Sequence, residues 1–170
     1  MQKILVIQTA FIGDVVLATA LLEKLSKFFP DAEIDFLVRK GNESLLQNNP
    51  HLNEILIWNK KEHKIKNLLK MLFVIRKKKY DKLINTQRFF ATGFLTAFSG
   101  AKQTIGFNKN PLSFLFTNSI KHIISKETGI KHEVERNNDL ISFFTDEVFT
   151  RPKLYPSDND ILSVQAYSKA

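Results

Sequence analysis

The stretch Ile4-Leu-Val-Ile-Gln-Thr-Ala-Phe-Ile-Gly-Asp-Val-Val-Leu17 decides the fold class of this chain. Its first four residues are aliphatic and predict a buried strand, and the apolar residues after Asp14 recur with the period of a helix. A loop between such a strand and such a helix lies at the carboxyl end of the strand, where open α/β sheets bind their ligands. Because Gly13 allows the backbone to turn tightly, the stretch predicts one edge of a binding site.

Asp14 stands at or just inside the N-terminus of the predicted helix, and two roles fit it there. Asp is a preferred N-cap residue, because its carboxylate accepts hydrogen bonds from free backbone N–H groups at the start of a helix. In the second role the same carboxylate faces the crevice and takes part in chemistry. The local pattern alone leaves both roles open.

The rest of the chain alternates between strand-like and helical patterns. Strands are predicted at Lys3–Ile7, Glu33–Val38, Glu54–Trp58, Lys82–Asn85 and Gln103–Phe107. Helices are predicted at Asp14–Phe29, Asn42–Asn48, Ile65–Lys79, Phe89–Phe98 and His132–Thr145. This alternation predicts an α/β fold with a Rossmann-like parallel sheet and helices on both faces.

Composition and length are those of one globular domain. The 170 residues are 44% hydrophobic and 25% charged, and they include no cysteine, which excludes disulfides and thiolate metal sites. The first apolar run is too short to span a membrane and lacks a small-residue cleavage site, so we expect a cytoplasmic protein. The stretch Arg151–Ser157 carries two prolines and loses the helical period, which predicts a linker after a domain at residues 1–150.

Positive charge is concentrated between Lys60 and Lys82. This segment contains ten Lys and Arg residues and only two acidic residues, Glu62 and Asp81. Its net charge is therefore +8, which equals the formal charge of the whole chain. The helix predicted at Ile65–Lys79 lies in this segment and is amphipathic. Three interpretations of it are open: solvated lysines above a packed apolar face, docking on an anionic membrane, and nucleic-acid binding. No nucleic-acid-binding motif accompanies the patch, so we expect no nucleic-acid partner. The candidate membrane-contact residues are Lys66, Lys70, Lys77, Lys78 and Lys79.

Four short motifs follow one another along the chain. They are Lys3–Leu22 with its Gly-Asp loop, Tyr80–Gln87 ending in Gln, Gly100-Ala-Lys-Gln-Thr-Ile-Gly-Phe107, and Lys131-His-Glu-Val-Glu-Arg136. In this order they resemble the N-terminal half of the lipopolysaccharide heptosyltransferases, glycosyltransferase family 9. The resemblance implies the N-terminal domain of a GT-B type glycosyltransferase, with residues 151–170 as linker and start of a C-terminal donor-binding domain that is otherwise absent.

The resemblance also implies a reaction, the inverting transfer of heptose from ADP-heptose to the lipopolysaccharide inner core. Asp14 matches the base that takes the proton of the acceptor hydroxyl, and no metal or other cofactor is expected. The expected substrate-binding residues are Thr9, Gly13, Gln87, Arg88, His132 and Arg136. Arg88 departs from the family pattern, in which Gly commonly follows the Gln, and this leaves the identity of the acceptor open.

Several polar residues near these motifs have a plain structural alternative. His132 and Arg136 lie four residues apart on one helix face and either bind substrate or bond to the sheet edge or a hinge. A metal site there is not expected, because Glu133 and Glu135 are predicted to point elsewhere. Lys109 and Lys131 are further candidate acceptor contacts, or simply solvated lysines.

The distribution of the phenylalanines adds one more indication of contact with a lipid-anchored acceptor. Most of the 15 phenylalanines belong in a core, but the loop-like stretch Pro111–Phe116 suits exposure towards a lipid-anchored acceptor. Two functions are thus in view. The first is the acceptor-binding half of a heptosyltransferase, peripheral on the inner face of the cytoplasmic membrane. The alternative is a non-catalytic binding or assembly module with the same fold. Either way, we expect the isolated chain to transfer no sugar.

Overall fold

A parallel sheet forms the centre of the molecule. The computed structural model describes residues 1–126 and 129–168, and within them six strands pair in the order β3-β2-β1-β4-β5-β6. The strands are β1 (Lys3–Ile7), β2 (Glu33–Arg39), β3 (Glu54–Trp58), β4 (Lys82–Asn85), β5 (Gln103–Phe107) and β6 (Asn118–Ile120). All five pairings are parallel. Because β1 and β4 are neighbours, the strand order reverses between them, and this switch point is where doubly wound sheets bind ligands.

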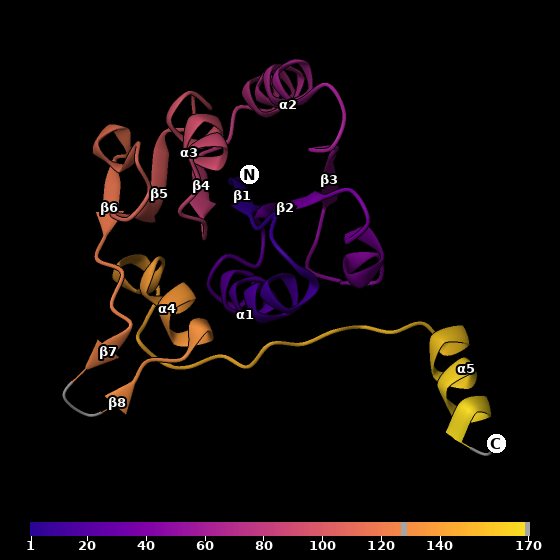
Figure 1. Cartoon of the computed structure of the whole chain (residues 1–170). Helices are drawn as coiled ribbons and strands as arrows, with labels where there is room; N and C mark the ends of the chain where they lie inside the picture. Colours follow the sequence, from indigo (N-terminus) through magenta and orange to yellow (C-terminus); the bar gives the residue numbers. More distant parts are fainter. Residues whose placement is uncertain (127–128, 169–170) are drawn as a thin grey trace.

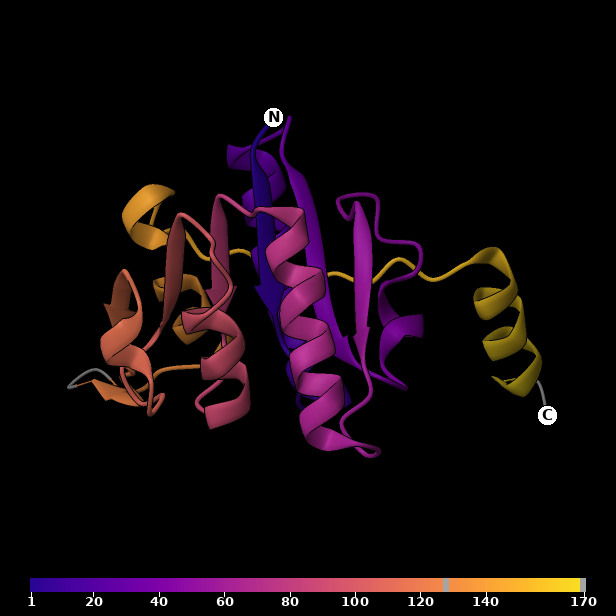
Figure 2. The same cartoon turned by 90° about the horizontal axis from the view of Figure 1, so that it is seen from above.

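Helices cover both faces of this sheet (Figures 1 and 2). Helix α1 (Ile12–Phe28) lies on one face together with α4 (Glu133–Asp139), which it contacts. Helices α2 (Lys64–Lys78) and α3 (Phe90–Ala97) lie side by side on the opposite face. The predicted α/β fold with helices on both faces is therefore confirmed.

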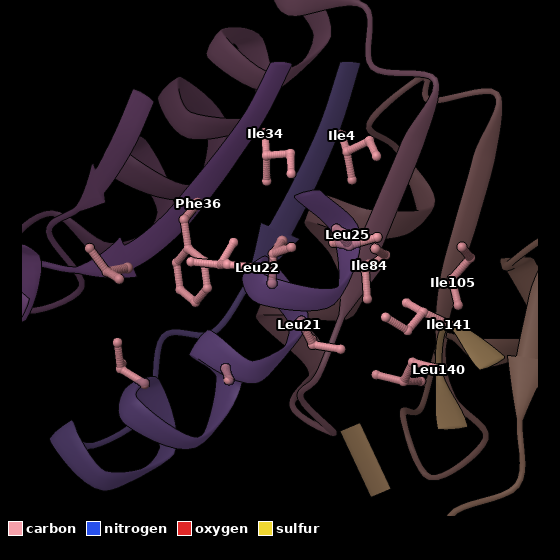
Figure 3. Close-up of a cluster of buried hydrophobic side chains, with 14 of the residues drawn as sticks. Ile4, Leu21, Leu22, Leu25, Ile34, Phe36, Ile84, Ile105, Leu140 and Ile141 are labelled. Atoms are coloured by element: carbon pink, nitrogen blue, oxygen red, sulfur yellow. The ribbon is translucent and has the colours of Figure 1, made fainter. Parts of the chain in front are cut away.

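The aliphatic run at residues 4–7 is explained by burial on both sides of β1. Ile4 and Val6 belong to the core beneath α1, whereas Leu5 and Ile7 belong to the core beneath α2 and α3. Figure 3 shows the first of these cores, where three leucines of α1 (Leu21, Leu22 and Leu25) lie among isoleucines of the sheet.

Some elements differ from the sequence prediction. The helix expected at Asn42–Asn48 is one 3-10 turn, η1 (Glu43–Leu46), because asparagine side chains on either side bond elsewhere: Asn42 Nδ2 donates to Ala10 O and Asn49 Oδ1 accepts from His51 N. The helix expected at His132–Thr145 stops at Asp139, and η3 (Ser142–Phe144) follows. Between them, Leu140 and Ile141 enter the core under α1.

Short elements that the sequence did not predict complete the fold. Strand β6 extends the sheet beyond β5, and a 3-10 turn, η2 (Ser113–Leu115), precedes it. A small antiparallel hairpin, β7 (Ser125–Lys126) and β8 (Gly129–Ile130), leads into α4. Among the described residues, no helix is long and apolar enough to cross a lipid bilayer.

The chain after η3 returns along α1. It runs in extended form beneath that helix to α5 (Asp158–Ser168), which stands apart from the sheet (Figure 1). Two contacts fix the extended stretch: Lys153 N donates to Thr19 Oγ1 at 3.0 Å, and Tyr155 Oη donates to Glu23 Oε1 at 2.9 Å. Residues 151–157 thus have the extended backbone expected of a linker, and the position of the domain boundary stays a prediction.

Lys24 makes a further connection between α1 and the returning chain. Its side chain is only 2% exposed, and its Nζ lies 2.6 Å from Asp146 Oδ1 and 2.7 Å from Asn138 Oδ1. The Nζ also donates to the backbone oxygens of Asp146 and Val148. The hydrogen bond from Lys24 is the main reason why the pKa of the Asp146 carboxyl is lowered. A buried ammonium with this many acceptors holds the segment after η3 against α1.

Candidate functional site

A cavity of about 1050 Å³ opens at the carboxyl ends of the strands. The segments that follow β1, β2, β3 and β4 line it, together with Phe107 at the end of β5 and residues of α4. It therefore covers the switch point between β1 and β4, the place that the Gly-Asp loop predicted.

Two of the predicted substrate-binding residues bond to each other across the switch point. Thr9 Oγ1 donates to Gln87 Oε1 at 2.6 Å, and both side chains are buried. This bond joins the segment after β1 to the segment after β4 at the floor of the cavity. Thr9 and Gln87 therefore shape the site first, and a direct bond from either of them to a substrate stays a prediction.

Asp14 lies just inside the N-terminus of α1 but is not its N-cap, which is Phe11, and a chemical role for its carboxylate stays a prediction. Helix α1 begins at Ile12, and the backbone N–H of Phe11 donates to Asp14 Oδ2 at 3.1 Å. The half-buried carboxylate also lines the cavity. Among the described residues, no protein group donates to its second oxygen, Oδ1, so that oxygen is available to a ligand.

The prediction that the backbone turns tightly at Gly13 is wrong. It lies inside the first turn of α1, its φ is not in the left-handed region, and it does not line the cavity. A Cβ added there meets no heavy atom within 4 Å. The chain turns before the helix, where Phe11 has an extended backbone that any residue can adopt.

The loop that carries Arg88 is held from outside the site. Asn110 Nδ2 donates to Gln87 O and to Phe89 O, both at 3.1 Å, and Arg88 between them lines the cavity. Gly93 of α3 packs against the Asn110 side chain so closely that a Cβ would collide with it. The glycine therefore permits the approach that fixes this loop.

The cavity holds more positive charge than the sequence analysis expected. Six Lys and Arg side chains and three carboxylates line it. The cations are Arg39, Lys40, Lys60, Lys61, Arg88 and Arg136, and the carboxylates are Asp14, Glu62 and Glu133. Only Asp14, Arg88 and Arg136 had been singled out. Glu133 lies in α4, whereas the rest lie at the end of β2 or just after β2 and β3, so the criterion that pointed to Asp14 and Gln87, position at the carboxyl end of a parallel strand, also applies to them.

Lys60 is the most perturbed of these cations. Its Nζ donates to Thr9 O at 3.1 Å and lies 4.8 Å from the centre of the Trp58 ring. Burial, with a smaller contribution from the neighbouring Arg39, lowers the pKa of Lys60 to about 8. The Arg39 guanidinium in turn lies over the Phe11 ring at 4.9 Å. This side of the cavity therefore holds cations in partly dehydrated surroundings, which strengthens their attraction for an anion.

His132 and Arg136, which were predicted as a pair, have different surroundings in the structure. His132 is the N-cap of the helix, where its Nδ1 accepts from Val134 N at 3.3 Å, and it does not line the cavity. Arg136 lines the cavity and pairs with Glu133, so the expectation that Glu133 points elsewhere was wrong. The reason is helical spacing, which brings residues three apart onto one face.

His122 occupies the place in the cavity that was predicted for His132. It lines the wall, and its ring meets that of Phe107 edge to face with centroids 4.7 Å apart. Burial, reinforced by nearby cations such as Lys109, lowers the pKa of His122. Nothing in the local sequence around His122 marked it, because it follows the unpredicted strand β6.

The remaining lysine candidates lie elsewhere. Lys131 pairs with Asp139, and Lys109 is exposed outside the cavity lining. Lys78 was predicted to face a membrane surface, but its Nζ binds Asp35 at 2.8 Å and Glu54 at 2.6 Å. The prediction is therefore wrong for this lysine. These two hydrogen bonds outweigh the effect of burial and raise the pKa of Lys78. The other predicted membrane-contact lysines are exposed: Lys66, Lys70, Lys77 and Lys79. Within residues 1–126 and 129–168, no cluster of three or more His, Asp or Glu side chains could hold a metal ion.

Sheet order, two-sided helical cover and a cavity at the switch point define the class of this domain. Its fold is the Rossmann-like fold of a GT-B type domain. Within that class the chain resembles the N-terminal half of the lipopolysaccharide heptosyltransferases, as its four motifs predicted. No known protein-family profile matches the chain.

Individual comparisons give the extent of this likeness. Lipopolysaccharide heptosyltransferase 1 of Campylobacter coli is 25% identical over 163 residues, which are 96% of this chain and 47% of that protein. A glycosyl transferase family 9 structure from Veillonella parvula has a TM-score of 0.81 at 20% identity, covering 99% of this chain and 49% of the other. ADP-heptose lipopolysaccharide heptosyltransferase II of Escherichia coli has a TM-score of 0.77 at 23% identity, covering 98% and 51%. The chain spans about half the length of these proteins.

Proposed function

We propose that this chain is the acceptor-binding half of a heptosyltransferase that transfers heptose from ADP-heptose to the lipopolysaccharide inner core. The observation that carries the proposal is one cavity in which Asp14 and a group of cations meet at the switch point of the sheet. The similarity to lipopolysaccharide heptosyltransferases supports the choice of sugar and acceptor.

The cations of the cavity suit an acidic acceptor. Inner-core sugars carry carboxylate and phosphate groups, and the planar fork of an arginine binds both kinds of group through paired hydrogen bonds. Arg88 and Arg39 approach the cavity from opposite sides of the switch point, after β4 and after β2. An acceptor between them has its acidic groups bound at both ends and its hydroxyls over the floor.

Asp14 then acts as the general base of a single, inverting displacement. Its free Oδ1 takes the proton of the acceptor hydroxyl while the hydroxyl oxygen bonds to C1 of the heptose and the bond from C1 to the diphosphate breaks. The proton ends on Asp14, and ADP leaves as the diphosphate product.

The proposal includes no metal and no other cofactor. It requires a donor-binding partner domain, because the 170 residues contain no glycine-rich stretch that would cradle a diphosphate. We further propose that the protein works on the inner face of the cytoplasmic membrane, where a lipid-anchored acceptor is presented, and that nucleic acid is not a partner.

Calorimetric titration of the isolated chain tests the acceptor half of this proposal. We expect it to bind a heptose-free inner-core acceptor, to lose that binding at high salt, and to show neither binding nor turnover of ADP-heptose. Binding of ADP-heptose in the absence of acceptor contradicts the assignment as acceptor half. Failure to bind the acceptor favours the alternative, a non-catalytic assembly module.

A chimera tests Asp14. Residues 1–157 are joined to the C-terminal half of the Escherichia coli heptosyltransferase II, whose N-terminal half has the same fold. In an active chimera, Asp14→Asn should lower kcat about a thousandfold, the middle of the usual range for loss of a general base. Glu62→Gln is the matched control, because Glu62 also lines the cavity but bonds to Asn59. Equal losses in the two variants contradict the role of Asp14 as the base.

A further inference from the structure

The apolar residues of α2 form two stripes, and only one of them packs on the sheet. Met71 and Ile75 are buried in the core with Leu5 and Ile7. The stripe Ile65, Leu69 and Phe73 is instead exposed, at 75%, 42% and 71% of the respective residue surfaces. These three residues are spaced by four and lie along one side of the helix for about 12 Å. One of the three interpretations left open for this helix, in which its apolar face packs on the sheet beneath solvated lysines, therefore does not hold for this stripe.

Neighbouring elements continue the exposed apolar surface. Helix α3, which lies beside α2 on the same face of the sheet, exposes Phe90 near its start and Phe98 at its C-cap. The 3-10 turn η2 contacts α3 and exposes Phe114 and Leu115. The partial exposure predicted for the segment around Phe114 is confirmed. Large exposed apolar patches of this kind mark interaction sites.

The charge on this face has one sign. Helix α2 carries six Lys and Arg residues and no acidic residue, and α3 carries no charged residue at all. Of the basic residues, Lys78 is held by Asp35 and Glu54, whereas Lys66, Lys70 and Lys77 are exposed and border the apolar stripe. Long lysine side chains can keep their stems on apolar surface while their ammonium groups reach outward.

This combination selects the partner. An apolar stripe bordered by lysines fits the boundary between headgroups and acyl chains of an anionic bilayer. A second copy of the chain fits poorly, because docking α2 on α2 would bring unpaired lysines of like charge together. Nucleic acid would use the lysines but would leave Ile65 and Phe73 in water, and among the described residues no nucleic-acid-binding motif accompanies them.

We propose that the outward side of α2, together with the adjoining Phe90, Phe98 and η2, docks on the surface of an anionic lipid bilayer. Ile65, Leu69 and Phe73 enter the headgroup region, and Lys66, Lys70 and Lys77 bind lipid phosphates. Docking in this way sets the cavity beside the bilayer, because the loop before α2 supplies Lys60, Lys61 and Glu62 to the cavity lining. The inference does not rest on sugar transfer, since vesicle binding needs neither donor nor acceptor.

Flotation of the 170-residue chain with vesicles tests the surface. Vesicles of phosphatidylcholine with about a third phosphatidylglycerol are compared with pure phosphatidylcholine vesicles at low and high salt. We expect binding to the anionic vesicles that high salt weakens. Phe73→Ser should weaken it about tenfold, from loss of an inserted aromatic ring. Lys66→Gln with Lys70→Gln should weaken it about twentyfold to thirtyfold, at roughly fivefold per lysine.

Matched controls lie on other faces of the molecule. Ile130→Ser removes an even more exposed apolar side chain from β8, and Lys27→Gln with Lys121→Gln removes two exposed lysines from α1 and from the loop after β6. These controls should bind like the unchanged chain. Because every substituted side chain is exposed, circular dichroism should show all variants folded.

Four results would overturn the inference. One is vesicle binding that Phe73→Ser leaves unchanged, and another is an equal loss in the control variants. The third is self-association at these concentrations that Phe73→Ser abolishes, because the stripe would then cover a second copy. The fourth result is competition by RNA. If RNA removes the chain from vesicles only when Lys66 and Lys70 are intact, and Phe73→Ser does not change this, the lysines belong to a nucleic-acid site instead.

Discussion

Replacing Lys24 by methionine should destabilise the domain by about 3 kcal/mol. The side chain keeps its length and apolar stem, so the substitution removes mainly the ammonium group and its bonds to Asp146 and Asn138. Breaking a buried ion pair by removing one partner costs about 3–5 kcal/mol. The lower end applies, because the Asp146 side chain is 35% exposed and water can solvate it after the change. The backbone oxygens of Asp146 and Val148, which accept from Lys24, lose their donor as well.

Urea unfolding followed by far-ultraviolet circular dichroism measures this loss directly. For a domain of this size, about 3 kcal/mol corresponds to a fall in Tm of roughly 6–12 °C. Lys27→Met is the matched control, since Lys27 is exposed on the same helix and its replacement should change stability by no more than about 0.5 kcal/mol. A loss below about 1 kcal/mol for Lys24→Met, or an equal loss for Lys27→Met, would refute the reasoning that the buried ammonium holds the returning chain.

Two further predictions concern the cavity. Since the pKa of Lys60 is lowered to about 8, the lysine is a cation at pH 7 and largely neutral at pH 9, and acceptor binding should weaken about tenfold between these pH values, the loss of one charge-assisted contact. Calorimetry on Lys60→Met should show weaker binding at pH 7 and little remaining change up to pH 9; an unchanged pH dependence assigns the effect to another group. Gly93→Ala should push Asn110 away from the loop around Arg88 and destabilise the domain by about 1–3 kcal/mol. Thermal unfolding checks it, with Ala97→Gly as a helix-propensity control, and a Tm equal to that of the unchanged chain contradicts the close packing.

The fold was predictable where the pattern is local and continuous. Strands β1, β3, β4 and β5 were predicted with the bounds that they have. In β1 the basis was an uninterrupted aliphatic run, which is typical of a parallel strand buried on both faces of the sheet. Strand β6 was not predictable. Its sequence Asn-Ser-Ile carries no period, and it joins the sheet through pairing with β5 and through bonds between Thr117 and Thr104. Such pairing is a long-range property.

The sidedness of α2 shows a different limit. Apolar residues at helical spacing predicted an amphipathic helix correctly, but the apolar residues of α2 form two overlapping stripes. Contact with Leu5 and Ile7 decides that Met71 and Ile75 belong to the core and that Phe73 does not. Lys24 is similar, because the groups that make its burial tolerable, on Asn138, Asp146 and Val148, are more than a hundred residues away in sequence.

The candidate site was predictable by strand position and only partly by residue type. Asp14, Gln87 and Arg88 follow strands and do line the cavity. Arg39 and Lys60 satisfy the same criterion but were not among the predicted site residues, because the basic residues between Lys60 and Lys82 were interpreted together as one charged helix. His132 was assigned by motif rather than by strand position, and its ring caps α4 outside the cavity.

The hydrogen bond between Phe11 N–H and Asp14 has a consequence for which product can form. It occupies one carboxylate oxygen and fixes the side chain to the first turn of α1, so the carboxylate cannot rotate freely to meet a hydroxyl. Under the proposed function, an acceptor hydroxyl can lose its proton only along the direction in which Oδ1 points. A neighbouring hydroxyl on the same sugar, displaced by one carbon, would find no base in reach. The regiochemistry of the new glycosidic bond would then be set by the backbone of a helix end.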